Sequence, residues 1–215
     1  MHMRALVIVA LLATAAHASA APSRRGARHD TGFRLGARLG VAIPMGDIAQ
    51  NMGLSDSVSA NLPIWLDAAY RFSPNFSAGI YFNYGFGFAS NCPAGVSCST
   101  HSVHLGAESF YHFLPRNSFD PYIGLGTGWE WMSLGASAGA QSLDYSFNGW
   151  EFLTFQAGGD FSVAPQWAVG PYLALSLGQY SNCGLSQNGV GQQCRIASTA
   201  VHEWFQFGVR GTFDF

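Results

Sequence analysis

Three histidines have the most versatile chemistry in this sequence: His101, His104 and His202. An imidazole can bind a metal ion or act as a general base, and Ser102 beside His101 adds a potential nucleophile. In the closed sheet inferred below, the strand carrying His202 is expected to lie half a circumference from the strand carrying the other two. We therefore expect scattered rim histidines, with no metal site and no catalytic residue.

Ionisable residues of both signs share one face of the alternating segments described below. They are Arg34, Arg38, Arg71, Arg210, Asp67, Glu108, Glu130, Asp160 and Asp214. Charges inside a narrow, water-poor space are stable only when they are paired. We expect Arg38, Asp67, Glu108 and Arg210 to form an ionic network that holds the interior together. The alternative is a path for protons or small ions.

Four cysteines lie in two polar segments. Five residues separate Cys92 from Cys98, and ten separate Cys183 from Cys194. Exported proteins meet oxidising conditions, so we expect disulfides, and the short separations favour the two local pairs. A bridge between the segments is the alternative. A metal site is disfavoured because the sequence contains no CxxC motif.

The composition excludes several classes of protein. Charged residues make up 10% of the chain and hydrophobic residues 48%, whereas soluble domains carry about 25% charged residues. The chain has no lysine and a net charge of −2, which argues against nucleic-acid binding. The apolar content excludes intrinsic disorder. No phosphate loop, dinucleotide motif or HExxH is present, and no cofactor is expected.

Hydrophobicity alternates with a period of two residues from Phe33 onward, which is typical of β-strands with two different faces. Eight such segments follow one another, at 33–43, 64–72, 76–88, 103–113, 122–131, 152–163, 167–178 and 201–215. Each is about nine residues or longer, enough for a tilted strand to cross a bilayer. The connections alternate between short turns and long loops near 45–62, 89–101, 135–149 and 181–198. The pattern predicts an all-β, eight-stranded antiparallel up-and-down transmembrane β-barrel.

Aromatic residues indicate which face meets the lipid. Phenylalanine and tryptophan gather on the apolar face beside the short turns, as in a membrane-interface girdle. The polar face instead mixes glycines and charges with bulky rings, so we expect it to fill a lumen that is just wide enough for side chains. The expected lumen rings are Trp65, Tyr81, Phe110, Tyr122, Phe152, Tyr172 and Trp204.

The first twenty residues are typical of a secretory signal peptide. Arg4 precedes an apolar stretch, and Ala18-Ser19-Ala20 is a small-x-small cleavage site. We expect residues 1–20 to be a cleaved signal, 21–32 a short polar lead-in, and 33–215 the barrel. Twelve apolar residues are too few for a membrane span of about 20 residues.

The signal, the eight alternating strands and the terminal phenylalanine resemble the small eight-stranded outer-membrane barrels of Gram-negative bacteria, the OmpA/OmpX/OmpW-like group. The resemblance rests on architecture and covers residues 33–215. It implies that Phe213 and Phe215 form an assembly signal similar to the one read by the barrel-assembly machinery. Lipid A deacylases of this kind use a His-x-Ser-Asn pattern, which His101-Ser102 and the segment 201–204 do not reproduce.

We therefore expect an integral outer-membrane protein of the cell envelope with a filled lumen and a structural or surface-interaction role. Its expected partners are outer-membrane lipid and, during insertion, the barrel-assembly machinery. A monomer is expected, with no nucleic-acid partner. The alternatives are a minor OmpW-like transporter of small apolar molecules and a lipid A-modifying enzyme.

Overall fold

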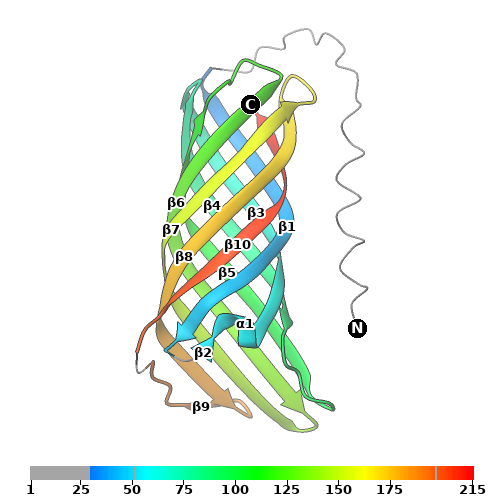
Figure 1. Ribbon diagram of the computed structural model, residues 1–215, viewed down its shortest axis with the longest axis vertical. Coiled ribbons are helices and arrows are strands. Elements are labelled where there is room, and N and C mark those ends of the chain that lie inside the picture. Colours follow the sequence, from blue (N-terminus) through cyan, green and yellow to red (C-terminus); the bar gives the residue numbers. More distant parts are fainter. Residues whose placement is uncertain (1–29, 51, 197) are drawn as a thin grey trace.

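A computed structural model describes residues 30–50, 52–196 and 198–215. The expected signal peptide, residues 1–20, and most of the expected lead-in lie outside the described residues. Among the described residues, no helix is long and apolar enough to cross a membrane. Figure 1 shows one tall barrel of tilted strands.

The sheet is an antiparallel ring in which eight long strands pair with their neighbours and β10 closes on β1. The strands are β1 (Gly32–Ala49), β2 (Met52–Gly53), β3 (Val58–Ser73), β4 (Phe76–Ala89), β5 (Ser97–His112), β6 (Phe119–Ala138), β7 (Gln141–Ser162), β8 (Trp167–Gln187), β9 (Val190–Gln192) and β10 (Val201–Asp214). The short strands β2 and β9 add to the edges of β1 and β8. This confirms the predicted eight-stranded up-and-down barrel.

The outer wall is apolar because every second residue of each strand points outward. Phe33, Leu39 and Ile80 are each more than 60% exposed, which in water would be unfavourable over so wide a surface. Rings pair at the short-turn end, where Phe119 contacts Phe161 at 4.6 Å and Trp167 contacts Phe213 at 4.8 Å between ring centroids. This wall is suited to a bilayer and not to water, as the sequence predicts.

The long loops differ from the expected loop segments, because several strands are far longer than a bilayer crossing requires. Strands β6, β7 and β8 contain 20, 22 and 21 residues, about twice the 9–11 needed to cross a bilayer. The β6–β7 hairpin turns at Gly139, whose φ of +59° favours glycine. The yellow-green β6–β7 hairpin and β9 project at the end of the barrel opposite the C-terminus (Figure 1).

One expected lumen residue is on the wrong side. The sequence predicts that Phe152 points inward, but it is 41% exposed on the outer wall. The register between β7 and β8 shifts between Glu151 and Leu153, and such a bulge moves the following side chains to the other face. Glu151 therefore occupies the lumen instead of Phe152.

A single helical turn covers the loop end of the lumen. Helix α1 (Leu54–Ser57) connects β2 to β3 and buries Leu54 completely. Leu54 belongs to an apolar cluster that we call the loop-side plug, made of Ala42, Ile48, Leu54, Val58, Met132, Phe147, Tyr180 and Trp204. Leu134, Cys183 and Ile196 pack against it. The plug separates the polar interior from the loop end.

Candidate functional site

The inward-facing side chains form a continuous polar column inside the barrel. Alternation along each strand points these residues inward, and an eight-stranded ring leaves room only for side chains. The column's ionisable members include Arg34, Arg38, Asp67, His104, Glu108, His112, Asp120, Glu130, Glu151, Asp160, His202, Arg210 and Asp214. Each is less than 10% exposed, so each depends on partners inside the lumen.

The contacts in this column fall into three groups along the barrel axis, which we call levels. The first level lies at the short-turn end. Arg34 of β1 donates two hydrogen bonds to Asp214 of β10, from Nε to Oδ1 at 2.5 Å and from Nη2 to Oδ2 at 2.9 Å. Its third nitrogen, Nη1, lies 3.1 Å from His112 Nε2. His112 Nδ1 in turn lies 2.8 Å from Asp120 Oδ2. This level ties the first strand to the last and to β5 and β6.

The middle level contains the four residues expected to form an ionic network. Arg38 Nη2 lies 2.8 Å from Glu108 Oε1 and 3.2 Å from Asp67 Oδ2, and Arg210 Nη2 lies 3.1 Å from Asp67 Oδ1. Gln156, which the sequence analysis did not single out, donates to Glu108 at 2.9 Å and accepts from Arg38 at 2.5 Å. The structure therefore brings all four together across the lumen.

Aromatic rings close the space around the middle level. The Arg38 guanidinium lies 4.4 Å from the centroid of Trp65, and that of Arg210 lies 4.5 Å from Phe110. A cation over a ring face is stabilised further when it is shielded from water. Charges and rings together fill the cross-section.

The third level, which we call the His–Glu level, lies towards the loop end. Its members are His104 of β5, Glu130 of β6, Glu151 of β7 and His202 of β10. His104 Nδ1 lies 2.7 Å from Glu151 Oε2, and His202 Nε2 lies 2.7 Å from Glu130 Oε2. His104 Nε2 is 3.9 Å from Glu130 Oε1. The four side chains form one chain of contacts across the barrel.

This arrangement corrects the expectation of scattered rim histidines. His104 and His202 are 2% and 1% exposed and contact the same carboxylate. Strands half a circumference apart still meet inside a barrel this narrow, because their side chains reach the axis from both walls. Only His101 matches the expectation: it is exposed and stacks on Tyr84 with centroids 6.2 Å apart.

Hydroxyl and indole groups hold the two glutamates of the His–Glu level. Tyr180 Oη and Trp204 Nε1 both donate to Glu130 Oε1, the second at 3.0 Å. Tyr81 Oη donates to Glu151 Oε1 at 2.5 Å, and Thr154 Oγ1 donates to the same atom. Sequence reasoning missed Glu151 because the bulge beside it breaks the alternation. Tyr180 was missed because β8 was expected to end at residue 178.

The loop-side disulfides join Cys92 to Cys98 and Cys183 to Cys194. These are the two local pairs that the spacing favoured. Cys183 packs against the loop-side plug, whereas Cys92 is exposed. The two disulfides therefore hold different segments. The Cys183–Cys194 bridge holds a segment over the lumen, and the Cys92–Cys98 bridge holds the tip of a hairpin.

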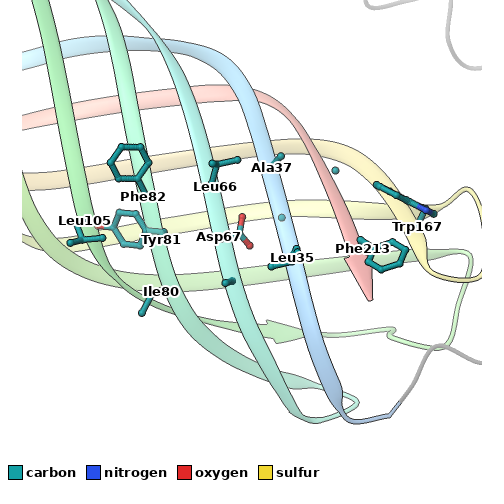
Figure 2. Close-up of a pocket in the computed structure, with 13 residues that line it drawn as sticks. Leu35, Ala37, Leu66, Asp67, Ile80, Tyr81, Phe82, Leu105, Trp167 and Phe213 are labelled. Atoms are coloured by element: carbon teal, nitrogen blue, oxygen red, sulfur yellow. The ribbon is translucent and has the colours of Figure 1, made fainter. Parts of the chain in front are cut away.

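A shallow apolar groove lies on the outer wall over β1, β3 and β4. Its volume is about 640 Å³, and its outward lining includes Leu35, Ala37, Leu66 and Ile80. Figure 2 shows these residues around Asp67, whose side chain is buried. The groove offers almost no polar atoms, so it is suited to a lipid chain and not to polar chemistry.

The chain matches no protein-family model and no curated protein sequence. Solved structures share its fold. Neisserial surface protein A has a TM-score of 0.52 at 14% identity, covering 86% of this chain and 97% of that one. A major outer membrane protein from Thermus thermophilus has a TM-score of 0.52 at 12% identity, covering 87% and 100%.

A third similar structure is Ail, the attachment invasion locus protein of Yersinia pestis, in complex with the heparin analogue sucrose octasulfate. Its TM-score is 0.50 at 12% identity, and the match covers 85% of this chain and 99% of that one. All three matches span nearly the whole of the other protein. The chain therefore has the fold of integral outer-membrane β-barrel proteins.

Proposed function

We propose that this chain is a closed outer-membrane barrel that displays a rigid contact surface at its loop end. The observation that carries this proposal is the surplus length of β6, β7 and β8, because strands twice as long as a crossing serve no purpose inside the bilayer. Both disulfides lie at the same end. A pre-ordered surface loses little conformational entropy when a partner binds.

The loop surface is polar and poor in basic groups, which limits the class of partner: its exposed charged residues include Asp47, Asp56 and Asp144 beside Arg195. Residues 89–100 contain no ionisable group apart from the bridged cysteines, and Arg195 is the only basic residue between 181 and 200. Serine, glycine, asparagine and glutamine dominate these segments and offer adaptable hydrogen bonds. We propose a neutral polysaccharide as the partner. A sulfated glycan of the kind bound to Ail would need basic side chains that these loops lack.

The filled lumen supports a barrel that is not an open pore, and the geometry at Ser102 argues against one type of catalysis. Three polar levels and the loop-side plug occupy the interior from one end to the other. His101 and Ser102 point to opposite faces, and the Ser102 hydroxyl accepts a hydrogen bond from Asn61 Nδ2 at 2.8 Å. No serine–histidine pair of the nucleophilic type is therefore formed by these two residues.

A binding experiment tests the surface role. Protein in lipid nanodiscs is applied to an array of neutral and sulfated glycans, beside a variant in which residues 137–142 of the β6–β7 hairpin are replaced by Asn-Gly. Ala136 and Leu143, which are partners in the native register, then flank the new turn. We expect the native barrel to bind neutral glycans and the shortened one to lose that binding. Equal binding by both, or a preference for sulfated glycans, contradicts the proposal.

Two further measurements test the closed barrel and the absence of an enzyme. Planar-bilayer recordings should show no steady large current from the native protein. Such a current would favour a transport role. Mass spectrometry of lipid A from cells with and without the protein should show the same number of acyl chains. A changed number would identify a lipid-modifying enzyme instead.

A further inference from the structure

The His–Glu level combines the ligand types that bind transition metals. One ligand atom each from His104, Glu130 and Glu151 lie within 4.8 Å of one another. Ligands around a four-coordinate zinc ion lie about 3.3 Å apart, given metal–ligand distances near 2 Å. Small side-chain rotations would therefore bring the three atoms onto one ion.

Charge compensation sets this level apart from the other two. Arg34 faces Asp214, and Arg38 and Arg210 face Glu108 and Asp67. Among the described residues, no arginine lies within ion-pair distance of Glu130 or Glu151, whose recorded ionic neighbours are the two histidines. The two carboxylates contribute a charge of −2, which a single divalent cation bound between them would balance.

The two carboxylates are held in the manner of metal ligands. In each, Oε1 accepts hydrogen bonds from hydroxyl or indole donors, while Oε2 points at an imidazole. Outer partners of this kind fix the orientation of ligating carboxylates and strengthen metal binding. Tyr81 performs this role for Glu151, and Tyr180 together with Trp204 performs it for Glu130.

Glycines provide the room that the cluster needs. Gly149 lies opposite Glu130 in the β6–β7 register, and Gly178 lies opposite both Glu151 and His202. A Cβ on Gly178 would lie 2.9 Å from His202 Nε2, and one on Gly128 would lie 2.6 Å from Tyr81 Oη. A larger residue at Gly178 or Gly128 would therefore displace His202 or Tyr81, the groups that hold Glu130 and Glu151.

The geometry points to a binding site for one divalent transition-metal ion in the lumen, with His104, Glu130 and Glu151 as its ligands. His202 is a positioning residue that holds Glu130 Oε2. One nitrogen and two carboxylate donors suit Zn²⁺ or Mn²⁺. They are too few for Ca²⁺, which takes six to eight oxygens. The site is independent of the glycan-binding surface, so either proposal can fail alone.

Metal binding to the refolded full-length barrel tests the site. The protein is refolded in detergent with Zn²⁺ present, because the loop-side plug covers the site, and is then desalted and assayed by elemental mass spectrometry. We expect one zinc per chain, and the same ratio with Mn²⁺ but not with Ca²⁺. No bound zinc, or equal retention of calcium, overturns the proposal.

Matched variants locate the ion. Glu130→Gln and His104→Gln should abolish binding, whereas His101→Gln removes an outward-facing imidazole from the same strand and should keep one zinc per chain. His202→Gln should keep the ratio but lower the affinity about 10- to 100-fold, as loss of an outer partner does. Equal zinc in all four variants means an adventitious ion only and contradicts the site.

A measurement on the native chain covers the case in which a ligand variant fails to fold. Folding is checked by the different gel mobility of unheated and heated barrels. Pulsed EPR of Mn²⁺-loaded protein with isotopically labelled histidine then reports directly on coordination. Coupling to one imidazole nitrogen supports the site, and bound Mn²⁺ without nitrogen coupling refutes it.

Discussion

Arg34 and Asp214, 180 positions apart in the chain, form a two-pronged ion pair across the seam where β1 meets β10. The Arg34 side chain is fully buried and that of Asp214 is 9% exposed. A paired fork of this kind fixes the relative position of both partners. The pair therefore holds the barrel closed where its two terminal strands meet.

Replacing Asp214 by Asn should weaken the seam. Among the described residues, the change leaves Arg34 with only the longer ion pair to Asp160, 3.6 Å from Nη1, so the loss should lie at or below that of a fully broken buried pair, about 3–5 kcal/mol. Urea unfolding in detergent measures the loss. Arg116→Gln is the control, because it removes an exposed pair with Asp30 (side chains 73% and 57% exposed) that contributes at most about 1 kcal/mol. Equal losses in both variants would show that burial of the seam pair has no special effect.

The cross-lumen contact between Arg38 and Glu108 should be energetically coupled. A double-mutant cycle with Arg38→Met and Glu108→Gln should give an interaction free energy of about 0.5–3 kcal/mol, the range for residues in one network. Arg116 and Glu108 share no recorded contact, so that pair should be additive within about 0.5 kcal/mol. If the free-energy effects of Arg38→Met and Glu108→Gln are additive, the two residues are not coupled, and the network does not hold the interior together.

Alanine at position 178 should disturb His202. The added Cβ would lie 2.9 Å from the imidazole Nε2, so the ring must leave Glu130 or the wall must shift, at a cost of about 1–3 kcal/mol. Zinc affinity should fall about 10- to 100-fold. Gly211→Ala is the control, since its Cβ would meet nothing within 4 Å. An unchanged zinc affinity in Gly178→Ala would show that His202 does not position Glu130.

The two disulfides should differ in importance. Replacing Cys183 and Cys194 by serine frees the segment that packs on the loop-side plug, with a loss of up to about 3 kcal/mol in the chain-entropy description. Limited proteolysis should then cut within 181–196 much faster. The same change at Cys92 and Cys98 should affect only cleavage near the exposed hairpin. Equal protection of both segments without their bridges would contradict this difference.

The terminal phenylalanine should matter for assembly more than for the finished barrel. Phe215 packs edge-to-face on Phe213 at 4.8 Å and is 54% exposed, so Phe215→Ala should scarcely change refolding into detergent. In cells, the folded fraction on unheated gels should drop if the assembly machinery reads this residue. Val209→Ala, also outward-facing on β10, is the control. An equal folded fraction in both variants would exclude Phe215 as an assembly signal.

The alternating pattern was sufficient to predict the barrel and the inward-facing residues of seven strands, because one face of each strand is predominantly apolar. It failed at Phe152, where the bulge inserts one residue into β7 and exchanges the two faces. No property of the side chains marks that insertion, since Trp150, Phe152 and Leu153 are all apolar.

The contacts within the His–Glu level could not be predicted from the sequence, for a different reason. Which residues meet across a lumen depends on the tilt and stagger of the strands, which alternation does not determine. His104 and His202 reach one carboxylate only because β5 pairs with β6 so that His104 faces Glu130. A glycine opposite an ionisable residue, such as Gly149 opposite Glu130, is the signal that could have suggested this cluster.

The contacts between non-adjacent strands also have a mechanical consequence. Arg38 of β1 is bonded to Glu108 on β5 and Gln156 on β7, and Tyr81 of β4 to Glu151 on β7. These links act as struts across the diameter, whereas wall hydrogen bonds resist only separation of neighbours. A hollow tube flattens into an ellipse under the lateral pressure of surrounding lipid. In this barrel the cross-lumen contacts should keep the cross-section circular. The stiffness of the barrel should therefore vary little with membrane thickness or lipid composition.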